Sequence, residues 1–496
     1  MPEEMSVSPL WSAYEMAAAT GGALCMKPLD QGSLDHEWAA ETWSASGISI
    51  DTRTLRAGDI FVALKDIRDG HDFLDAAFEA GASAALVDQV GDRSPGGAPL
   101  LVVDNALGAL TRLAKAARQR NFGKRVAITG SAGKTSTKEM MRTVLEGFGT
   151  THAADKSLNN HIGVPLTLAR LPIRSDYGVF EIGMNHANEI TPLSQLVRPH
   201  IAIITTVGEA HLENFDSVEG IAHAKAEIML GLAEDGIAIL PIDNEHFGLL
   251  TTLADKAGVS RIVTFGEDAR ADVRLLDYDT DGVTGRVKAF AGGERLSFEI
   301  GAPGKHQAMN ALTVLAAASE LGLPIAEAAQ RLKFFGAGGG RGLQKRITLA
   351  GGRSVTILDE SYNANPSSAR AALELLAAMS ASPSGRKIVV LGDMLELGEN
   401  AAGLHAGLKP NVEAAGVAKV YTVGRLAKSL FDAVGAPMKG TASETSTDVV
   451  RQLQEDLQDG DIVMVKGSNA SKVSKVVDAL IEVSTDTGAE KSVNSA

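Results

Sequence analysis

The chain has 496 residues, and at about 100–200 residues per domain this length predicts roughly three domains. Hydrophobic residues make up 45% and charged residues 22%, which excludes wholesale disorder, a coiled coil and a collagen-like chain. The formal net charge of −14 at pH 7 repels phosphates and anionic lipid surfaces, so neither nucleic acid nor a membrane is an expected partner of the whole chain.

The start of the chain lacks the pattern of an export signal. Acidic Glu3, Glu4 and Glu15 stand among small residues, where a signal needs a basic start and an apolar run. No window reaches the roughly 18 uncharged apolar residues of a membrane span. Cys25 is the only cysteine, which excludes internal disulfides and suits a reducing compartment. We therefore expect a cytoplasmic protein, and a monomer.

The N-terminal part, residues 1–108, has the pattern of a small α/β domain. Short apolar runs at 59–64 and 84–88 are separated by an amphipathic stretch at 73–80, which predicts two strands around a helix.

From residue 125 onward, apolar strands alternate with helix-forming segments. The expected strands are 126–129, 178–182, 201–206 and 237–240. Their apolar runs are continuous, which is typical of a parallel sheet covered by helices on both faces. We assign residues 109–342 to this central domain.

A glycine-rich stretch, 336–340, interrupts the pattern and predicts a hinge between domains. Strands are expected again at 355–359, 387–392, 419–423 and 461–466. Because helices separate them, a Rossmann-like domain is expected over residues 343–484. The polar tail, 485–496, is expected to be disordered.

The segment 126–137 carries the most specific motif, since a buried strand runs into a glycine loop and then into a helix-forming stretch. It is a shortened form of the G-x-x-x-x-G-K-[ST] pattern, because Ile128 stands at the first glycine position. Glycines let backbone N–H groups approach phosphate, the lysine neutralises the outer phosphates, and the hydroxyl of Thr135 can bind Mg²⁺. The alternative is an ordinary turn with an exposed lysine, which this context disfavours. We expect ATP or GTP to bind, with contacts from Gly130, Ser131, Ala132, Gly133, Lys134, Thr135 and Ser136.

Further candidates lie at strand ends of the same domain. Glu181 closes one expected strand and His211 follows another, and ligands of such sheets lie beyond the carboxyl ends of the strands. A carboxylate and an imidazole there can hold the metal of a nucleotide. Taken singly, each is weak evidence, and Lys225 has by default the pattern of a helix-surface lysine.

Taken together, these segments resemble the central domain of the Mur ligases. The resemblance is carried, in order, by the phosphate loop with 135–138 and by 159–166, 181–183, 210–213 and 224–227. It implies a carbamylated Lys225, whose new carboxylate would bind a second Mg²⁺. The catalytic residues it implies are Lys134, Glu181, His211 and Lys225, and the metal ligands are Thr135, Glu181, His211 and Lys225.

The flanking domains indicate which kind of family member this is. Residues 51–53, 58–64 and 69–73 resemble the uridine-nucleotide module of the ligases that add the third and fifth residues, whereas 359–366 and 391–398 resemble the D-alanyl-D-alanine-adding members. By resemblance, Asn310, Arg341 and Asp359 also bind the nucleotide. The implied substrate-binding residues are Asp51, Thr52, Arg53, Gly70, His71, Asn159, Asn160, Asn363, Asn365, Asp393, Glu396 and Lys466.

The resemblance implies an α/β protein with three domains: a small uridine-binding domain, a central P-loop ATPase domain with a parallel sheet, and a C-terminal Rossmann-like domain. It also implies an ATP- and Mg²⁺-dependent amide ligase that adds D-alanyl-D-alanine to UDP-N-acetylmuramoyl-tripeptide through an acyl phosphate. The alternatives are a sister ligase that adds diaminopimelate or lysine, a folylpolyglutamate synthetase, which would lack the 51–53 module, and a P-loop nucleotide switch. Gln307 and Asn469 depart from the Asn and Arg that are commoner in the family.

Overall fold

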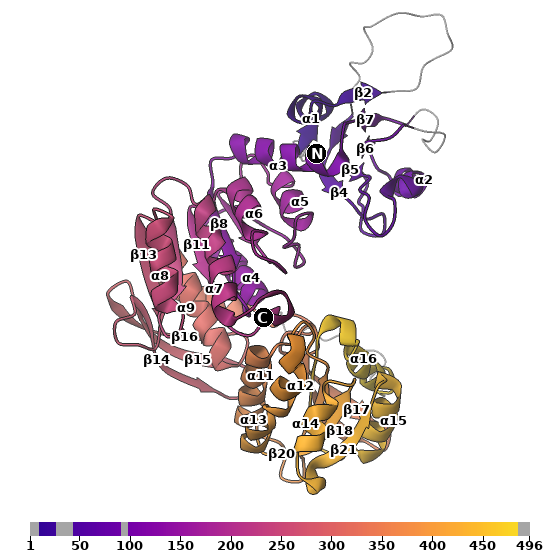
Figure 1. The fold of residues 1–496 in the computed structure, drawn as a ribbon, viewed down its shortest axis with the longest axis vertical. Helices are drawn as coiled ribbons and strands as arrows, with labels where there is room; N and C mark the ends of the chain where they lie inside the picture. Colours follow the sequence, from indigo (N-terminus) through magenta and orange to yellow (C-terminus); the bar gives the residue numbers. More distant parts are fainter. Residues whose placement is uncertain (1–8, 26–42, 91–97, 485–496) are drawn as a thin grey trace, which may run out of the picture.

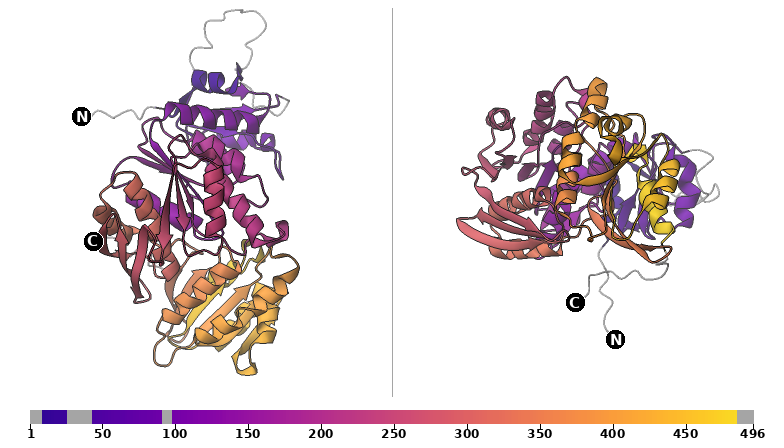
Figure 2. Two further views of the ribbon diagram at one scale, coloured as in Figure 1. Left: turned by 60° about the vertical axis from the view of Figure 1, so that its left-hand side comes forward. Right: turned by 90° about the horizontal axis from the view of Figure 1, so that it is seen from below.

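The computed structural model describes residues 9–25, 43–90 and 98–484, so the proposed tail lies outside the described residues. Figure 1 shows three α/β units in chain order, with the central unit between the other two, and Figure 2 shows the same arrangement from two further sides. None of the helices in these ranges is long and apolar enough to cross a bilayer.

The N-terminal domain is built on a five-stranded sheet with the order β2-β7-β6-β5-β4, in which β2 is antiparallel and the others are parallel. Its strands are β2 (Ala23–Cys25), β4 (Gly47–Ser49), β5 (Asp59–Val62), β6 (Ala84–Val87) and β7 (Leu100–Val102), with a separate pair β1 (Trp11–Ser12) and β3 (Ser44–Ala45). Its helices are α1 (Ala13–Thr20) and α2 (Leu74–Glu79), preceded by a 3₁₀ turn at Gly70–Phe73. The strands and helix predicted here are confirmed.

Helix α3 (Ala106–Arg120) joins the first two domains. Its buried residues recur every three or four positions, which gives one apolar stripe along the helix. The stripe packs against α1 and against α5 (Gly163–Ala169) of the central domain. The proposed boundary at residue 108 therefore falls in the first turn of a continuous helix.

The central domain has a nine-stranded sheet with the order β16-β15-β14-β13-β12-β11-β8-β10-β9 within residues 98–484. The strands are β8 (Lys124–Thr129), β9 (Thr151–Ala153), β10 (Tyr177–Glu181), β11 (Ile201–Ile204), β12 (Ile237–Pro241), β13 (Arg261–Gly266), β14 (Val273–Thr280), β15 (Gly285–Ala291) and β16 (Glu294–Ile300). The helices are α4 (Lys134–Leu145), α5, α6 (Ile190–Val197), α7 (Val218–Ala226), α8 (Phe247–Lys256), α9 (Lys305–Glu320) and α10 (Ile325–Arg331), with 3₁₀ turns at Leu212–Asn214, Glu227–Gly231 and Leu332–Phe334.

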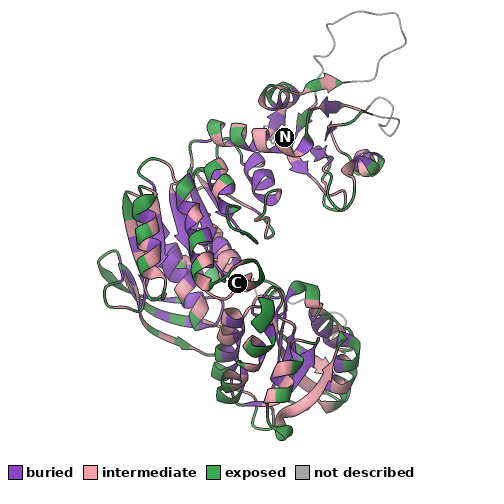
Figure 3. Cartoon of the chain, viewed as in Figure 1, coloured by how far each residue is buried: buried purple, intermediate pink, exposed green. Residues whose placement is uncertain are grey.

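Both faces of this sheet are covered, as predicted. One core cluster includes Ile182 and Ile221 and continues into the N-terminal domain, and the other includes Met140 and Leu312 of α4 and α9. Figure 3 shows the inner strands of this sheet as buried and much of the outer helix surface as exposed. The sheet is not wholly parallel, however, because β14, β15 and β16 form an antiparallel meander at one edge that the sequence analysis did not predict.

The C-terminal domain has a six-stranded sheet with the order β17-β18-β22-β19-β20-β21, parallel except for β17. The strands are β17 (Leu343–Leu349), β18 (Arg353–Glu360), β19 (Lys387–Gly392), β20 (Val417–Val423), β21 (Lys439–Ser443) and β22 (Ile462–Lys466). The helices are α11 (Pro366–Ala378), α12 (Ala401–Ala406), α13 (Lys409–Ala414), α14 (Lys428–Ala433), α15 (Ser446–Asp456) and α16 (Ser474–Glu482), with 3₁₀ turns at Gly398–Asn400, Ala436–Met438 and Asn469–Ser471. The four predicted strands are confirmed.

The chain enters this domain through the glycine-rich stretch. Phe335 is buried in the core of the central domain, whereas Gly340 is held to the C-terminal domain because its N–H donates to Asp359 Oδ2 at 2.8 Å. Between these anchors, a Cβ added at Gly336, Gly338 or Gly339 would meet no atom within 4 Å. Bending is therefore least hindered at residues 336–339.

Candidate active site

The phosphate loop joins β8 to α4 with the geometry that the motif predicted. Gly130 (φ +152°) and Gly133 (φ +84°) adopt backbone conformations that favour glycine, and a Cβ would collide with Thr205 at the first and with Asn310 at the second. No side chain caps the N-terminus of α4, and the helix begins at Lys134. Its free N–H groups and its dipole therefore form an anion site at the loop.

Lys134 folds back over this loop. Its Nζ donates to the carbonyl of Gly130 at 2.6 Å. Burial lowers the pKa of Lys134, while the charge of Glu181 acts in the opposite direction. A phosphate oxygen can replace the carbonyl as acceptor and would restore the compensating negative charge.

A polar cluster surrounds Thr135, the next residue of α4. Its hydroxyl donates to Glu181 Oε2 at 2.8 Å and lies 2.9 Å from the hydroxyl of Ser157. Asn159 donates to Glu181 Oε1 at 2.7 Å. The side chain of Lys138 is fully buried and its Nζ donates to the carbonyl of Ala154 at 2.5 Å, which fixes the loop that carries Ser157 and Asn159.

This cluster fits a metal ion that arrives with a nucleotide. The described residues contain no group of three His, Cys, Asp or Glu side chains that could hold a metal unaided. In nucleotide sites Mg²⁺ usually takes one or two carboxylates and completes its shell with phosphates and water. The Glu181 carboxylate and the Thr135 hydroxyl are the expected protein ligands for that arrangement.

The C-terminal domain contributes the opposite side of the site. Arg341 donates to Ser157 Oγ at 3.0 Å, and its guanidinium lies 3.9 Å from the ring centroid of Tyr362. Asn365 donates to the carbonyl of Ser131 in the phosphate loop at 3.1 Å. The two domains therefore meet directly over the loop.

A second contact between the central and C-terminal domains joins His211 to Glu396. The ring Nδ1 lies 2.5 Å from Glu396 Oε2, and this hydrogen bond lowers the pKa of the carboxyl group. Both residues have left-handed backbones, with φ of +60° and +62°. In this arrangement one nitrogen of His211 is occupied by Glu396, so only Nε2 is available to a ligand.

Lys466 lies with Glu360 and Asn363 at the C-terminal side. Its side chain is 2% exposed, and its Nζ donates to Glu360 Oε2 at 3.3 Å and to the carbonyl of Asn363 at 3.1 Å. A buried ion pair at the wall of a cavity offers a cation and an anion to a zwitterionic ligand.

These groups line one cavity of about 910 Å³ between the central and C-terminal domains. The predicted residues in its wall are Ser131, Ala132, Gly133, Lys134, Thr135, Ser136, Asn159, Glu181, His211, Asn310, Arg341, Asn363, Asn365, Glu396 and Lys466. The volume suits a nucleotide-sized ligand.

Several predicted residues lie outside this wall. The carbonyl of Gly130 accepts from Lys134 beneath the loop, and Asn160 Oδ1 accepts from the N–H of Gly163, the first residue of α5, at 2.8 Å. Asp359 braces the hinge through Gly340, and Asp393 accepts from Ala427 N at 2.8 Å within its own domain. These four residues shape loops and are not part of the cavity wall.

Lys225 also lies outside the wall. It is on α7 with 2% of its surface exposed, so the surface position expected by default is wrong. Burial and, secondarily, the charge of Lys134 lower the pKa of Lys225 well below its ordinary value. The amine is therefore neutral far more readily than that of a surface lysine.

The residues predicted for the uridine nucleotide lie in the N-terminal domain, away from the cavity wall. Arg53 is exposed and holds Asp51 with two hydrogen bonds of 2.9 and 2.7 Å, which lower the pKa of Asp51. Thr52 lies between them in sequence. The ring of His71, beside Gly70, is buried between Asp69 (2.6 Å) and Asp88 (3.3 Å).

Other residues of the wall were not among the predicted site residues. Ser157, His306 and Phe265 line the cavity, as do Glu360 and Tyr362. Glu360 and Tyr362 stand inside the segment 359–366, so closer attention to strand-end polar residues would have found them. Ser157 stands in a loop with no periodic or motif signal.

Comparisons with known proteins identify the family. Residues 128–318 match the Mur ligase middle domain, and residues 345–469 match the family described as Mur ligase, glutamate ligase domain. The UDP-N-acetylmuramoyl-tripeptide--D-alanyl-D-alanine ligase of Rickettsia prowazekii is 32% identical over 434 residues, which cover 87% of this chain and 94% of that protein. The Bacillus subtilis protein of the same name is 35% identical over 444 residues, covering 88% and 93%.

Solved structures give the same family over most of the chain. The crystal structure I of MurF from Acinetobacter baumannii has a TM-score of 0.79 and 28% identity, and covers 96% of this chain and 100% of that one. MurF ligase from Thermotoga maritima in complex with ADP has a TM-score of 0.73 and 25% identity, with coverage of 88% and 97%.

Proposed function

The chain belongs to the Mur ligase family, and we propose that it uses ATP to join D-alanyl-D-alanine to UDP-N-acetylmuramoyl-tripeptide. One observation carries this proposal: the phosphate loop and the C-terminal motif residues face the same cavity. Lys134 lies on the central side, Asn363 and Lys466 lie on the other, and Asn365 bonds directly to the loop. Relatives of that printed name align over nearly the whole chain.

The first step is attack of the tripeptide carboxylate on the γ-phosphate of ATP. Two anions must approach, so the step needs positive charge and hydrogen-bond donors around the transferring group. Lys134, the N-terminus of α4 and Arg341 supply these from this chain. ADP leaves, and the tripeptide carries an acyl phosphate.

The second step is attack of the dipeptide amine on the acyl carbonyl. The tetrahedral intermediate collapses to an amide and releases phosphate. We assign the dipeptide to the C-terminal side, with its carboxylate near Lys466 and its polar groups near Asn363 and Glu396. Water would hydrolyse the acyl phosphate, so the contact of Asn365 with Ser131 serves to keep this side closed.

Mg²⁺ would supply further charge neutralisation at the phosphates. We assign it to Thr135 and Glu181, and a second ion to His211 and a carbamylated Lys225. The lowered pKa of Lys225 supports the modification, because carbamylation requires the neutral amine.

We assign the uridine nucleotide to the N-terminal domain, at Asp51, Thr52, Arg53, Gly70 and His71. The position of His71 between two carboxylates supports a role in shaping the loop. The charge of Lys156 contributes to the lowered pKa of Asp51, so the loop with Asn159 lies near this module. We further propose a cytoplasmic location, which suits an ATP-consuming enzyme with one free cysteine, and a monomeric state.

Phosphate release and amide formation test the proposal together. Purified protein receives ATP, Mg²⁺ and UDP-N-acetylmuramoyl-tripeptide, with D-alanyl-D-alanine, diaminopimelate, lysine or no amine. We expect an amide product only with the dipeptide. A parallel reaction contains the dipeptide-linked acceptor in place of the tripeptide. Formation of an amide product there with diaminopimelate or lysine would identify a sister ligase instead.

Lys134→Ala is the variant for this assay. We expect loss of product with an unchanged unfolding temperature, because Lys134 contacts the loop and does not pack in a core cluster. Near wild-type turnover in this variant would contradict the nucleotide assignment.

A further inference from the structure

The β14–β15 hairpin lies outside the wall of the nucleotide cavity, yet its tip contacts the C-terminal domain. The carbonyl of Gly282, in the turn between the two strands, accepts a hydrogen bond from the side-chain amide of Gln344 in β17. A Cβ at Gly282 would lie 3.5 Å from Met379 Cγ, at the end of α11. We propose that this hairpin is a positioning arm for the C-terminal domain and that Gln344 is the positioning residue that engages it.

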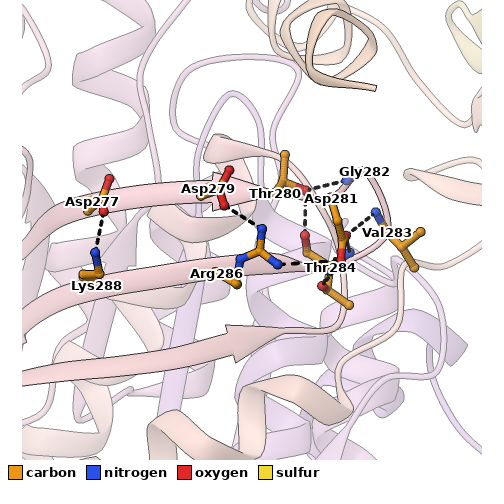
Figure 4. A network of polar contacts seen from close by, with 9 residues as sticks. All are labelled: Asp277, Asp279, Thr280, Asp281, Gly282, Val283, Thr284, Arg286 and Lys288. Carbon is orange, nitrogen blue, oxygen red and sulfur yellow. Dashed lines mark hydrogen bonds and ion pairs between the residues drawn. The ribbon is translucent and has the colours of Figure 1, made fainter. Parts of the chain in front are cut away.

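The tip of the arm is held in shape by hydrogen bonds within the turn itself. Asp281 Oδ1 accepts from the N–H groups of Val283 and Thr284 at 2.9 and 2.8 Å. The hydroxyl of Thr280 donates to the carbonyl of Thr284 at 2.6 Å and accepts from Gly282 N at 3.0 Å. Figure 4 shows these bonds closing the turn around Gly282. The carbonyl that receives Gln344 is therefore held in one orientation.

The shaft of the arm keeps its register. Asp277 pairs with Lys288 at 2.8 Å, and Asp279 pairs with Arg286 at 2.6 Å, both across β14 and β15 (Figure 4). Each exposed pair contributes little free energy, but cross-strand pairs of opposite charge disfavour a shifted register. Strand β15 is also paired along its other side with β16.

The shaft of the arm also contacts the nucleotide side of the molecule. The hydroxyl of Tyr278 in β14 accepts from Gly304 N at 2.5 Å. Gly304 has φ +114° and is the N-cap residue of α9, the helix that places Gln307 and Asn310 in the cavity wall. The same hairpin thus contacts the helix behind the nucleotide and the first strand of the C-terminal domain.

The effect of the contact between Gln344 and Gly282 depends on its position near the hinge. Gln344 stands four residues beyond Gly340, where the glycine-rich stretch ends, and Gly336, Gly338 and Gly339 of that stretch have open space around them. A domain held only by a flexible segment would sample many orientations. The arm is an attachment near the hinge, and Asn365 and Glu396 are attachments at the cavity, so together they fix the direction of closure.

A coupling measurement tests the arm and rests on the proposed function, because it assumes an acyl phosphate that water can intercept. Gln344→Ala removes the donor, and Lys345→Ala, at the next and exposed position of β17, is the matched control. In wild type and control we expect one phosphate for each amide bond. In Gln344→Ala we expect excess phosphate and a kcat about three- to tenfold lower, the size of one lost hydrogen bond, with an unchanged KM for ATP.

The coupling ratio separates positioning from a folding defect, since inactive molecules lower the rate without changing the ratio. A ratio and kcat equal to those of the control would overturn the proposal. Absence of amide product in wild type would instead overturn the proposed function.

A second variant approaches from the hairpin. Asp281→Ala frees the turn while leaving Gln344 in place, and the double variant completes a cycle. If both residues act through the same contact, the ratio of phosphate to amide in the double variant should be no higher than in the single variant with the higher ratio. Fully additive effects on coupling would show that the hairpin and Gln344 act independently, and they would overturn the proposal of a positioning arm. Unfolding temperatures of all variants report whether the fold is retained.

Discussion

Lys225 shows how burial can prepare a side chain for chemistry. A cation that is 2% exposed, with Lys134 nearby, is costly to keep charged, so its pKa falls. The neutral amine can then take up carbon dioxide and become a carboxylate. That change would reverse the sign of the local charge from one that repels Mg²⁺ to one that binds it.

We predict that Lys225→Ala loses nearly all activity and regains part of it in high concentrations of a short carboxylic acid such as acetate. The acid would supply the missing carboxylate in the space left by the side chain. Ligation rates with and without acetate provide the measurement, and Lys256→Ala, at an exposed position of α8, is the control. Full activity of Lys225→Ala without acetate would exclude the modification.

His200 gives a prediction about pH. Its Nδ1 accepts from Arg125 N at 3.0 Å, and burial beside Arg125, Lys124 and Arg198 lowers the pKa of His200 from 6.5 to about 4. The unfolded chain therefore binds the proton more tightly than the folded one. The contribution of His200 to stability is complete above pH 6.5 and is lost as the pH falls toward 4.

With a discount for partial solvent screening, this loss amounts to about 1–3 kcal/mol. His200→Asn keeps an acceptor for Arg125 N but does not titrate in this range. Urea unfolding of wild type and variant at pH 7 and pH 4.5 checks the prediction: the wild type should lose more unfolding free energy. Equal losses in both proteins would mean that His200 is not the titrating group.

At the scale of elements, Asn365 performs two tasks at the start of α11. Its Oδ1 caps the helix by accepting from Ser368 N at 2.8 Å, while its Nδ2 donates to Ser131 in the phosphate loop. The first task stabilises the helix and the second joins two domains. One side chain thus links the beginning of a helix to the nucleotide site.

Two substitutions separate these tasks. Asn365→Asp retains a good cap but loses the donor, so we predict an unchanged unfolding temperature and a kcat lowered about three- to tenfold. Asn365→Ala should lose both, with about 1 kcal/mol of stability in addition. Thermal unfolding and ligation rates of the two variants provide the comparison, and equal activities of Asn365→Asp and wild type would contradict the bridging role.

The elements themselves were predictable to different degrees. Buried parallel strands such as β8 and β19 are continuous apolar runs, so composition alone located them within one or two residues. The meander was missed because β14 carries Asp277 and Asp279 in place of a continuous run. The alternating pattern of its partner β15 indicates a strand only once the neighbouring strand is known.

The site was predictable where a backbone motif fixes side-chain direction. In the phosphate loop, two glycines and the start of a helix fix the position of each residue. Each predicted residue of the loop can therefore be located in the structure. Asp359 and Asp393 stand at strand ends, where a small change in loop path turns a carboxylate from the cavity toward a neighbouring N–H. Spacing in the sequence does not determine that direction.

At the scale of the whole molecule, the first two domains form one body. Helix α3 runs through both, Trp11 Nε1 donates to Ala169 O at 2.9 Å, and Arg170 donates to Ile48 O at 2.6 Å. The uridine module should therefore keep its position relative to the phosphate loop while the C-terminal domain moves.

This division predicts which substrate each domain governs. Arg53→Ala should raise the KM for the UDP substrate about tenfold or more, the size of a lost charge-assisted hydrogen bond, and leave the KM for D-alanyl-D-alanine within about twofold. Steady-state kinetics with each substrate varied in turn checks this, with exposed Arg56→Ala as the control. Equal rises in both KM values would mean that residues 51–53 do not form the uridine site.

The chain passes from the central to the C-terminal domain once, at residues 336–342, and the described part of the C-terminal domain is one unbroken stretch of sequence. A single recombination breakpoint in the codons for 336–339 would therefore exchange that whole domain and leave the code for the phosphate loop untouched. A break at one place in the gene can separate the coding sequence for the activation chemistry from the coding sequence for the proposed choice of the incoming amine. A family built in this way can acquire a new amino-acid preference without rebuilding its nucleotide site, provided that the incoming domain offers a donor at the position of Gln344.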